Sequence, residues 1–303
     1  MTSNRVVLSV SDQKGLGRRS LARQVGAGTA AVAAVTALGV GGVTVASSPA
    51  QAQAITDPDI FNFALNLEYL EAEYYLRGVT GQGLSDADVG GTGTPGGVTG
   101  GRTVAFQSDY LRQYLTRIAV DEQTHVRFIR AVLGSSAVAR PAIDFTTAFT
   151  VLARAAGLIN SSQTFDPFAD EVSFLLGASV FEDVGVTAYG GAAALISNRD
   201  FLSYAGSILA VEAYHAGAVR TLIANIGGGE AFNKIAALRA TLSGRNDDVG
   251  ILVPGNQFNF APTDDQAQTF RRTPRQVLNI VYGAQNSAAG LFFPAGANGT
   301  IRA

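Results

Sequence analysis

The chain has 303 residues, of which 47% are hydrophobic and only 15% are charged, so it can bury a large core. It contains no cysteine, which excludes disulfides, thiolate metal ligands and cysteine nucleophiles. The chain has 22 Lys and Arg and 24 Asp and Glu, so it has no excess of basic residues that would bind nucleic acid. We therefore expect no nucleic-acid partner.

Residues 1–54 have the layout of an export signal. A polar, basic opening leads into an uncharged run rich in Ala, Gly and Val, which ends in the small residues of "SSPAQAQA". The stretch "GRRSLAR" (17–23) resembles a twin-arginine signal. The apolar run is long enough to span a bilayer, but its small-residue end favours cleavage over a stable membrane anchor. We therefore expect export by the twin-arginine machinery to the periplasm, the cell envelope or the exterior.

Four long helices are predicted after this segment. The first follows an N-cap at Thr56 or Asp57, has Pro58 in its first turn and is expected to end at Gly78. A glycine-rich insert at 81–101 then favours a mobile linker. Apolar residues at helical spacing predict the four helices at 57–78, 103–133, 167–196 and 201–227.

The connections between these helices indicate the fold class. A long segment, 135–168, contains a short helical stretch and joins the second helix to the third, whereas a tight turn joins the third to the fourth. We predict an all-α fold over 55–228, a four-helix bundle with a long central crossover. Residues 229–303 are predicted to form a C-terminal extension of short helices and irregular segments, in which Phe292 and Phe293 need a surface to pack on.

The two histidines of the chain each end a Glu-x-x-His motif. Glu122 precedes His125 on the second helix, and Glu212 precedes His215 on the fourth. Three residues along a helix bring both side chains to one face, where they can hold one ion. A single motif of this kind is common on exposed helices, but here the two copies use every histidine.

The first and third helices supply matching glutamates. Glu68 is followed seven residues later by Tyr75, and Glu182 is followed seven residues later by Tyr189. Almost two helical turns separate each pair, so each tyrosine should lie on the face of its own glutamate. The tyrosines then either hydrogen-bond near the site or serve as core aromatics. Glu71, one turn after Glu68, is an alternative ligand, a hydrogen-bond partner of an imidazole, or an exposed residue.

Other charged residues near the motifs are expected to lie outside the site. Asp121 and Asp183 adjoin ligands in sequence, but one residue along a helix rotates a side chain by about 100°. We expect solvent or outer contacts for both and treat Asp121 as a bystander. The arginines on the same helices are expected beside or away from the site; they are Arg127, Arg130 and Arg220.

Four buried carboxylates need compensating positive charge, because a desolvated charge must be paired or protonated. Two divalent cations would balance them, and oxygen and imidazole ligands without sulfur suit iron or manganese. The predicted ligands are Glu68, Glu122, His125, Glu182, Glu212 and His215.

This arrangement over 57–226 resembles the ferritin-like di-metal carboxylate superfamily. The segments "NFALNLEYLEAEYY", "FEDVGVTAYGGAA", "RTPRQVLNIVYG" and "FFPAGANG" look like the desiccation-related ferritin-like proteins of plants and bacteria, which extends the resemblance to most of the chain after residue 54. Bridging glutamates would hold two ions close together and leave open positions for dioxygen or peroxide, so we expect redox chemistry. The expected reaction is either ferrous oxidation or peroxide disproportionation as in manganese catalases, which share this ligand scheme.

The alternative is a non-enzymatic stress, desiccation or envelope protein in which the metal site is structural or lost. Iron storage in a closed cage is disfavoured by the insert and the C-terminal extension, and a homodimer is left open.

Overall fold

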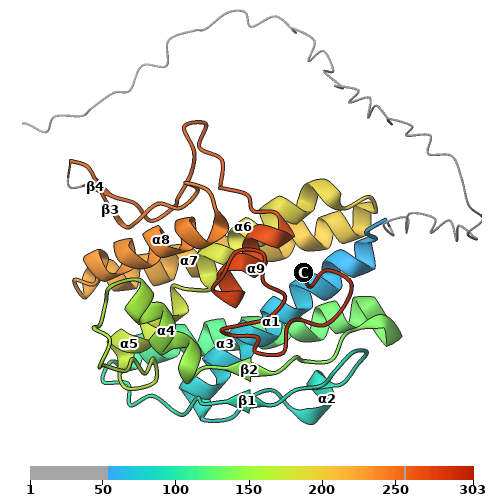
Figure 1. The fold of residues 1–303 in the computed structure, drawn as a ribbon, viewed down its shortest axis with the longest axis horizontal. Helices are drawn as coiled ribbons and strands as arrows, with labels where there is room; N and C mark the ends of the chain where they lie inside the picture. Colours follow the sequence, from blue (N-terminus) through green and yellow to red (C-terminus); the bar gives the residue numbers. More distant parts are fainter. Residues whose placement is uncertain (1–53, 256) are drawn as a thin grey trace, which may run out of the picture. The chain divides into compact units, whose positions relative to one another are not determined.

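The computed structural model describes residues 54–255 and 257–303 (Figure 1). The predicted export signal lies almost entirely outside these residues. Among the described residues, one helical stretch, 171–195, is long and apolar enough to cross a membrane, but 83% of its most apolar window is buried inside the protein. That burial is what a core helix of the bundle shows.

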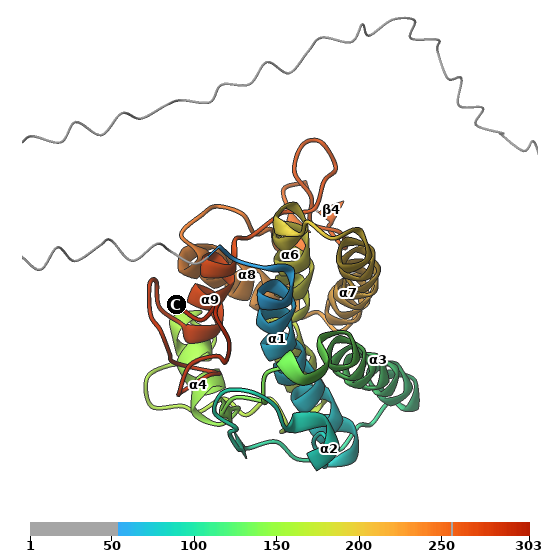
Figure 2. The ribbon, with the colours of Figure 1, turned by 90° about the vertical axis from the view of Figure 1, so that its right-hand side faces the viewer.

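The described chain is mostly helical, and the predicted all-α bundle is confirmed. Figure 2 looks roughly along the bundle, with α1, α3, α6 and α7 arranged around its core. α1 packs most extensively along α3, and α6 packs most extensively along α7, so each half of the bundle is a pair of helices. The bundle helices are α1 (Asp57–Thr80), α3 (Asp109–Leu133), α5 (Glu171–Ala178), α6 (Glu182–Ala192) and α7 (Arg199–Asn225).

α1 begins as the sequence predicts but ends later. Thr56 caps its start: the Thr56 side chain accepts from the backbone N–H of Asp59, whose carboxylate accepts from the backbone N–H of Thr56. The predicted end at Gly78 was wrong, because Gly78 lies inside the helix under the ring of Phe174. A Cβ at Gly78 would come within 2.2 Å of that ring. The helix ends instead at Gly81, whose φ of 78° is left-handed.

The glycine-rich insert is not a plain linker. It contains α2 (Asp86–Val89) and β1 (Val98–Thr99), which pairs in parallel with β2 (Ile143–Asp144) of the crossover. The backbone N–H of Thr92 also donates to the carbonyl of Ala137 at 2.9 Å. The prediction of a linker was therefore wrong, since composition does not show which backbone groups a distant segment will satisfy.

The third predicted helix is interrupted between α5 and α6. At Ser179 the backbone carbonyl accepts a hydrogen bond from the Arg239 guanidinium, and the chain tightens through 179–181 before α6 begins at Glu182. α3 starts at Asp109 rather than at residue 103, because the Ser108 side chain caps it by accepting from the N–H of Leu111 at 3.1 Å.

The remaining elements are short and join or cover the bundle. α4 lies in the crossover, η1 and η2 are single 3₁₀ turns, and β3 pairs antiparallel with β4 in the C-terminal extension. Their bounds are η1 (Gly134–Ser136), α4 (Thr147–Ala155), η2 (Ala193–Leu195), α8 (Gly229–Ser243), β3 (Leu252–Val253), β4 (Gln257–Phe258) and α9 (Pro274–Tyr282).

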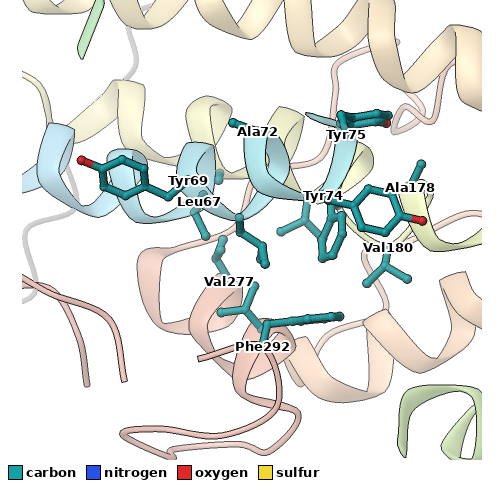
Figure 3. Packing of buried hydrophobic residues seen from close by; sticks show 14 of the residues in the cluster. Leu67, Tyr69, Ala72, Tyr74, Tyr75, Ala178, Val180, Val277 and Phe292 are labelled. Atoms are coloured by element: carbon teal, nitrogen blue, oxygen red, sulfur yellow. The ribbon is translucent and has the colours of Figure 1, made fainter. Parts of the chain in front are cut away.

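The C-terminal extension is attached to the bundle by apolar packing. Phe292 and Phe293 are fully buried, as the sequence required. The ring centroid of Phe292 lies 5.0 Å from that of Phe149 and 4.9 Å from that of Phe181. Figure 3 shows Phe292 in this packed core together with Tyr74 and Tyr75 of α1, whose ring centroids lie 5.6 Å apart.

Buried ion pairs also hold the C-terminal extension against the bundle. Asp183 of α6 accepts from Arg220 of α7 at 2.8 Å and from Arg239 of α8 at 2.7 Å. Asp248 then pairs with both Arg239 and Arg272, at 2.8 and 2.9 Å. These aspartates and arginines are all buried or nearly so, and they fix α8 and residue 272 against the helix that carries Glu182.

Candidate metal centre

The structure brings the six predicted ligands together in the core of the bundle. α1 supplies Glu68, α3 supplies Glu122 and His125, α6 supplies Glu182, and α7 supplies Glu212 and His215. All six are buried, and the most exposed of them, His125, is only 8% exposed. The side chains of both Glu-x-x-His motifs therefore face the core of the bundle.

The six residues form two overlapping groups of potential ligand atoms. Within each group, one carboxylate oxygen or imidazole nitrogen from each residue lies within 4.8 Å of the chosen atoms of the others. The first group contains Glu68, Glu122, His125 and Glu212, and the second contains Glu122, Glu182 and His215. Glu122 is the one residue that the two groups share.

Both histidines present Nδ1 to the carboxylates. His125 Nδ1 lies 3.1 Å from Glu68 Oε2, 3.3 Å from Glu122 Oε2 and 3.5 Å from Glu212 Oε1. His215 Nδ1 lies 2.8 Å from Glu122 Oε1 and 3.7 Å from Glu182 Oε2. Each imidazole thus contacts carboxylates from several helices, as a ligand of a shared centre would.

Most of the buried side-chain polar atoms that lack a hydrogen bond in the described chain belong to this cluster. They are Glu182 Oε2, both carboxylate oxygens of Glu212, and Glu122 Oε1 and His215 Nδ1, which lie 2.8 Å apart but not in the geometry of a hydrogen bond. Leaving such an atom unpaired costs roughly 1–3 kcal/mol, and more when it is charged. These atoms are all Lewis bases that converge on one place, so the residues present fit divalent cations.

The tyrosines hold the two outer glutamates in a crossed arrangement. Tyr75 of α1 donates its hydroxyl to Glu182 of α6, and Tyr189 of α6 donates its hydroxyl to Glu68 of α1. The sequence placed each tyrosine beside the glutamate of its own helix. The structure shows that it bonds the glutamate of the other helix, because α1 and α6 run antiparallel and position 68 meets position 189.

Asp121 contacts the centre from outside: the outer contact that the sequence allowed is present, and only its treatment as a bystander was wrong. Its Oδ2 lies 3.3 Å from His215 Nε2, and it accepts from Arg117 Nε at 3.0 Å. A carboxylate at Nε2 fixes the imidazole so that Nδ1 faces the ligand cluster. The prediction failed because Asp121 contacts the histidine of α7 rather than that of its own helix.

Glu71 lies at the edge of the cluster. It is 4% exposed and belongs to neither group of ligand atoms. Among the arginines, Arg220 pairs with Asp183, Arg127 pairs with Asp88, and Arg130 donates to the Tyr69 hydroxyl, so none of the three reaches the cluster through these contacts. Their predicted placement away from the site agrees with the structure.

Burial and mutual repulsion shift the titration of the cluster. Desolvation raises the pKa of Glu68 to about 8 and also raises the pKa values of Glu71, Glu182 and Glu212, to which the neighbouring carboxylates add. Burial alone would raise the pKa of Glu122 too, but the hydrogen bond from His125 and the charge of both imidazoles lower it.

The pKa values of the two imidazoles are raised, whereas burial alone would lower them. Desolvation alone would lower the pKa of His215, but the surrounding carboxylates raise it to about 10. The pKa of His125 is raised for the same reason. In the absence of metal the cluster therefore retains protons at neutral pH, and a cation has to displace them.

A helical bundle with one Glu on each of two helices and Glu-x-x-His on each of the other two defines the ferritin-like class of carboxylate proteins. The family model described as "Ferritin-like domain" matches residues 56–225, more than half of the chain, and the protein belongs to this family.

Two relatives cover most of the chain. The ferritin-like catalase Nec2 of Nesocodon mauritianus is 27% identical over 266 residues, which are 81% of this chain and 84% of the relative. The desiccation-related protein PCC13-62 of Craterostigma plantagineum is 27% identical over 262 residues, 79% of this chain and 82% of the relative. No solved structure gave a significant match.

Proposed function

We propose that the protein binds two divalent metal ions, iron or manganese, at this centre and uses them in redox chemistry with peroxide or dioxygen. The observation that carries the proposal is the convergence of buried ligand atoms from four helices, several of which have no hydrogen-bond partner. The relative named a ferritin-like catalase supports peroxide as the substrate.

The roles of the residues follow from their contacts. When bound, the metals would supply electron transfer and Lewis acidity. Glu122 lies between the two histidines and can bridge, while Glu68 and Glu182 are oriented by the hydroxyls of Tyr189 and Tyr75. Glu71 is buried beside the cluster with a raised pKa, so its carboxyl can hold a proton there.

Elemental analysis of the protein from its native export route tests metal binding. We expect about two ions per chain in the wild type and a large loss in Glu122→Ala and in His215→Ala, because each removes a ligand of the second group. If the wild type and both variants carry equally little metal, the proposal fails.

A second candidate is a metal site that only stabilises the bundle, and the relative named a desiccation-related protein favours it. Peroxide and ferrous turnover measured on the metal-loaded sample separates the two candidates. Stoichiometric metal without turnover, together with a melting temperature that falls steeply on chelation, would leave only the structural role.

We further propose that residues 1–54 direct export by the twin-arginine route and are then removed. The support is the layout of the segment, with the adjacent Arg18 and Arg19 ahead of an apolar run. N-terminal sequencing of the exported protein should find a start near residue 53 or 55, and the double change of both arginines to lysine should block export.

A further inference from the structure

Gly185 lies on α6 between Glu182 and Tyr189 and faces the cluster. A Cβ built on it would lie 2.2 Å from Glu212 Oε2, 3.1 Å from the carboxylate carbon of Glu212 and 3.4 Å from Glu71 Oε1. The carboxylate of Glu212 therefore occupies the space that any other residue at position 185 would fill.

Backbone conformation does not explain this glycine. Gly185 is within α6 and is not among the described glycines with a positive φ. In an ordinary helical conformation, glycine is less stable than alanine because it loses more backbone freedom on folding. The close approach of Glu212 is the feature of the structure that requires the missing side chain.

Glu212 is also the least restrained carboxylate among the predicted ligands. Glu68 and Glu182 each accept from a tyrosine hydroxyl, and Glu122 Oε2 is within hydrogen-bonding distance of His125 Nδ1 at 3.3 Å. Neither carboxylate oxygen of Glu212 makes a hydrogen bond, and its nearest imidazole contact, from Oε1 to His125 Nδ1, is longer at 3.5 Å. This carboxylate is fixed mainly by the space available to it, and Gly185 forms one side of that space.

We propose that Gly185 is a positioning residue of the metal centre, which acts through Glu212. The space beside its Cα accommodates the Glu212 carboxylate within the ligand cluster, where Glu212 Oε1 lies 3.5 Å from His125 Nδ1. This inference rests on the proposed metal-binding function. Alanine at position 185 would displace the Glu212 carboxylate from this space.

Gly206 of α7 provides a matched control. It also lies inside a long helix without a positive φ, and a Cβ built on it would meet nothing within 4 Å. Gly206→Ala therefore makes the same chemical change in a helix without displacing a neighbour.

The first experiment uses the metal-free full chain. We expect Gly206→Ala to raise the melting temperature in the wild-type and in the Glu212→Ala background alike. Gly185→Ala should raise it only in the Glu212→Ala background, because only there has the obstructing carboxylate been removed. This dependence on a second residue is a coupling that a purely local effect of alanine would not produce.

The second experiment is titration calorimetry with Mn²⁺, and with Fe²⁺ under anaerobic conditions. We expect Gly185→Ala to weaken binding by roughly 10–100-fold, the range typical of residues that orient metal ligands, and Gly206→Ala to leave it unchanged. If the wild type binds Mn²⁺ and Gly185→Ala binds it equally tightly, the positioning role is overturned while the metal centre stands. If the wild type takes up neither ion, both are overturned.

Discussion

Replacing Tyr75 by Phe tests whether the crossed tyrosine–glutamate bonds serve the metal centre. Tyr75 is fully buried, and its hydroxyl donates to Glu182, one oxygen of which already lacks a hydrogen bond. Removing the donor leaves a second oxygen of a buried carboxylate unpaired, which costs about 1–3 kcal/mol. For a domain of this size that corresponds to a melting temperature lower by roughly 2–12 °C.

Tyr74, the preceding residue, is a matched control for this change. It is equally buried, but its hydroxyl donates to the backbone carbonyl of Phe174 at 2.7 Å and not to a carboxylate of the cluster (Figure 3). Both Tyr→Phe variants should lose stability by a similar amount. Only Tyr75→Phe should bind Mn²⁺ more weakly, by about 10–100-fold, because only it changes the orientation of a ligand.

The assay is therefore thermal unfolding and Mn²⁺ calorimetry on the same three samples: wild type, Tyr74→Phe and Tyr75→Phe. The reasoning would be refuted if Tyr75→Phe kept the wild-type affinity, or if Tyr74→Phe lost as much affinity as Tyr75→Phe. In either case the tyrosine would act as a core aromatic and not as a support of the ligand.

Three further predictions follow from buried charge. In the metal-free protein, Glu68 with its pKa of about 8 and His215 with its pKa of about 10 retain protons that the unfolded chain releases. The free energy of unfolding measured in urea should therefore fall as the pH rises from 5 to 9. A free energy of unfolding that rises over this range would contradict the raised pKa values. Asp183→Asn should lower the free energy of unfolding by about 3–5 kcal/mol, because it leaves two buried guanidinium groups without their carboxylate. In the same assay, the control Arg112→Gln, which removes an exposed ion pair, should lower it by less than about 1 kcal/mol. Asp121→Ala should weaken Mn²⁺ binding about 10-fold or more by freeing His215, and unchanged affinity would show that their contact does not orient the ring.

The sequence was sufficient to predict the helical bundle and the residues that face its core. Helical spacing placed each Glu-x-x-His pair on one face, and the absence of other histidines and of cysteine restricted the candidates. The same spacing put Glu68 and Glu182 at equivalent positions of the two halves. These inferences depend on periodicity within one helix, which a sequence displays directly.

Features that depend on contacts between distant segments were not predictable in this way. α1 continues past Gly78, on which the Phe174 ring packs, and the third predicted helix is interrupted where the Arg239 guanidinium bonds the Ser179 carbonyl. Asp121 bonds a histidine ninety-four residues away. A glycine inside "EDVGVTAY" was a visible signal of close approach, but the sequence did not identify Glu212 as the neighbour.

Anomalous diffraction from crystals grown with Mn²⁺ tests the central claim, a dinuclear centre bridged by Glu122, most directly. We predict two manganese peaks within the bundle, one contacted by Glu68 and His125, the other by Glu182 and His215, with Glu122 contacting both. A single peak, peaks elsewhere on the protein, or an absence of manganese in the cluster would contradict the account.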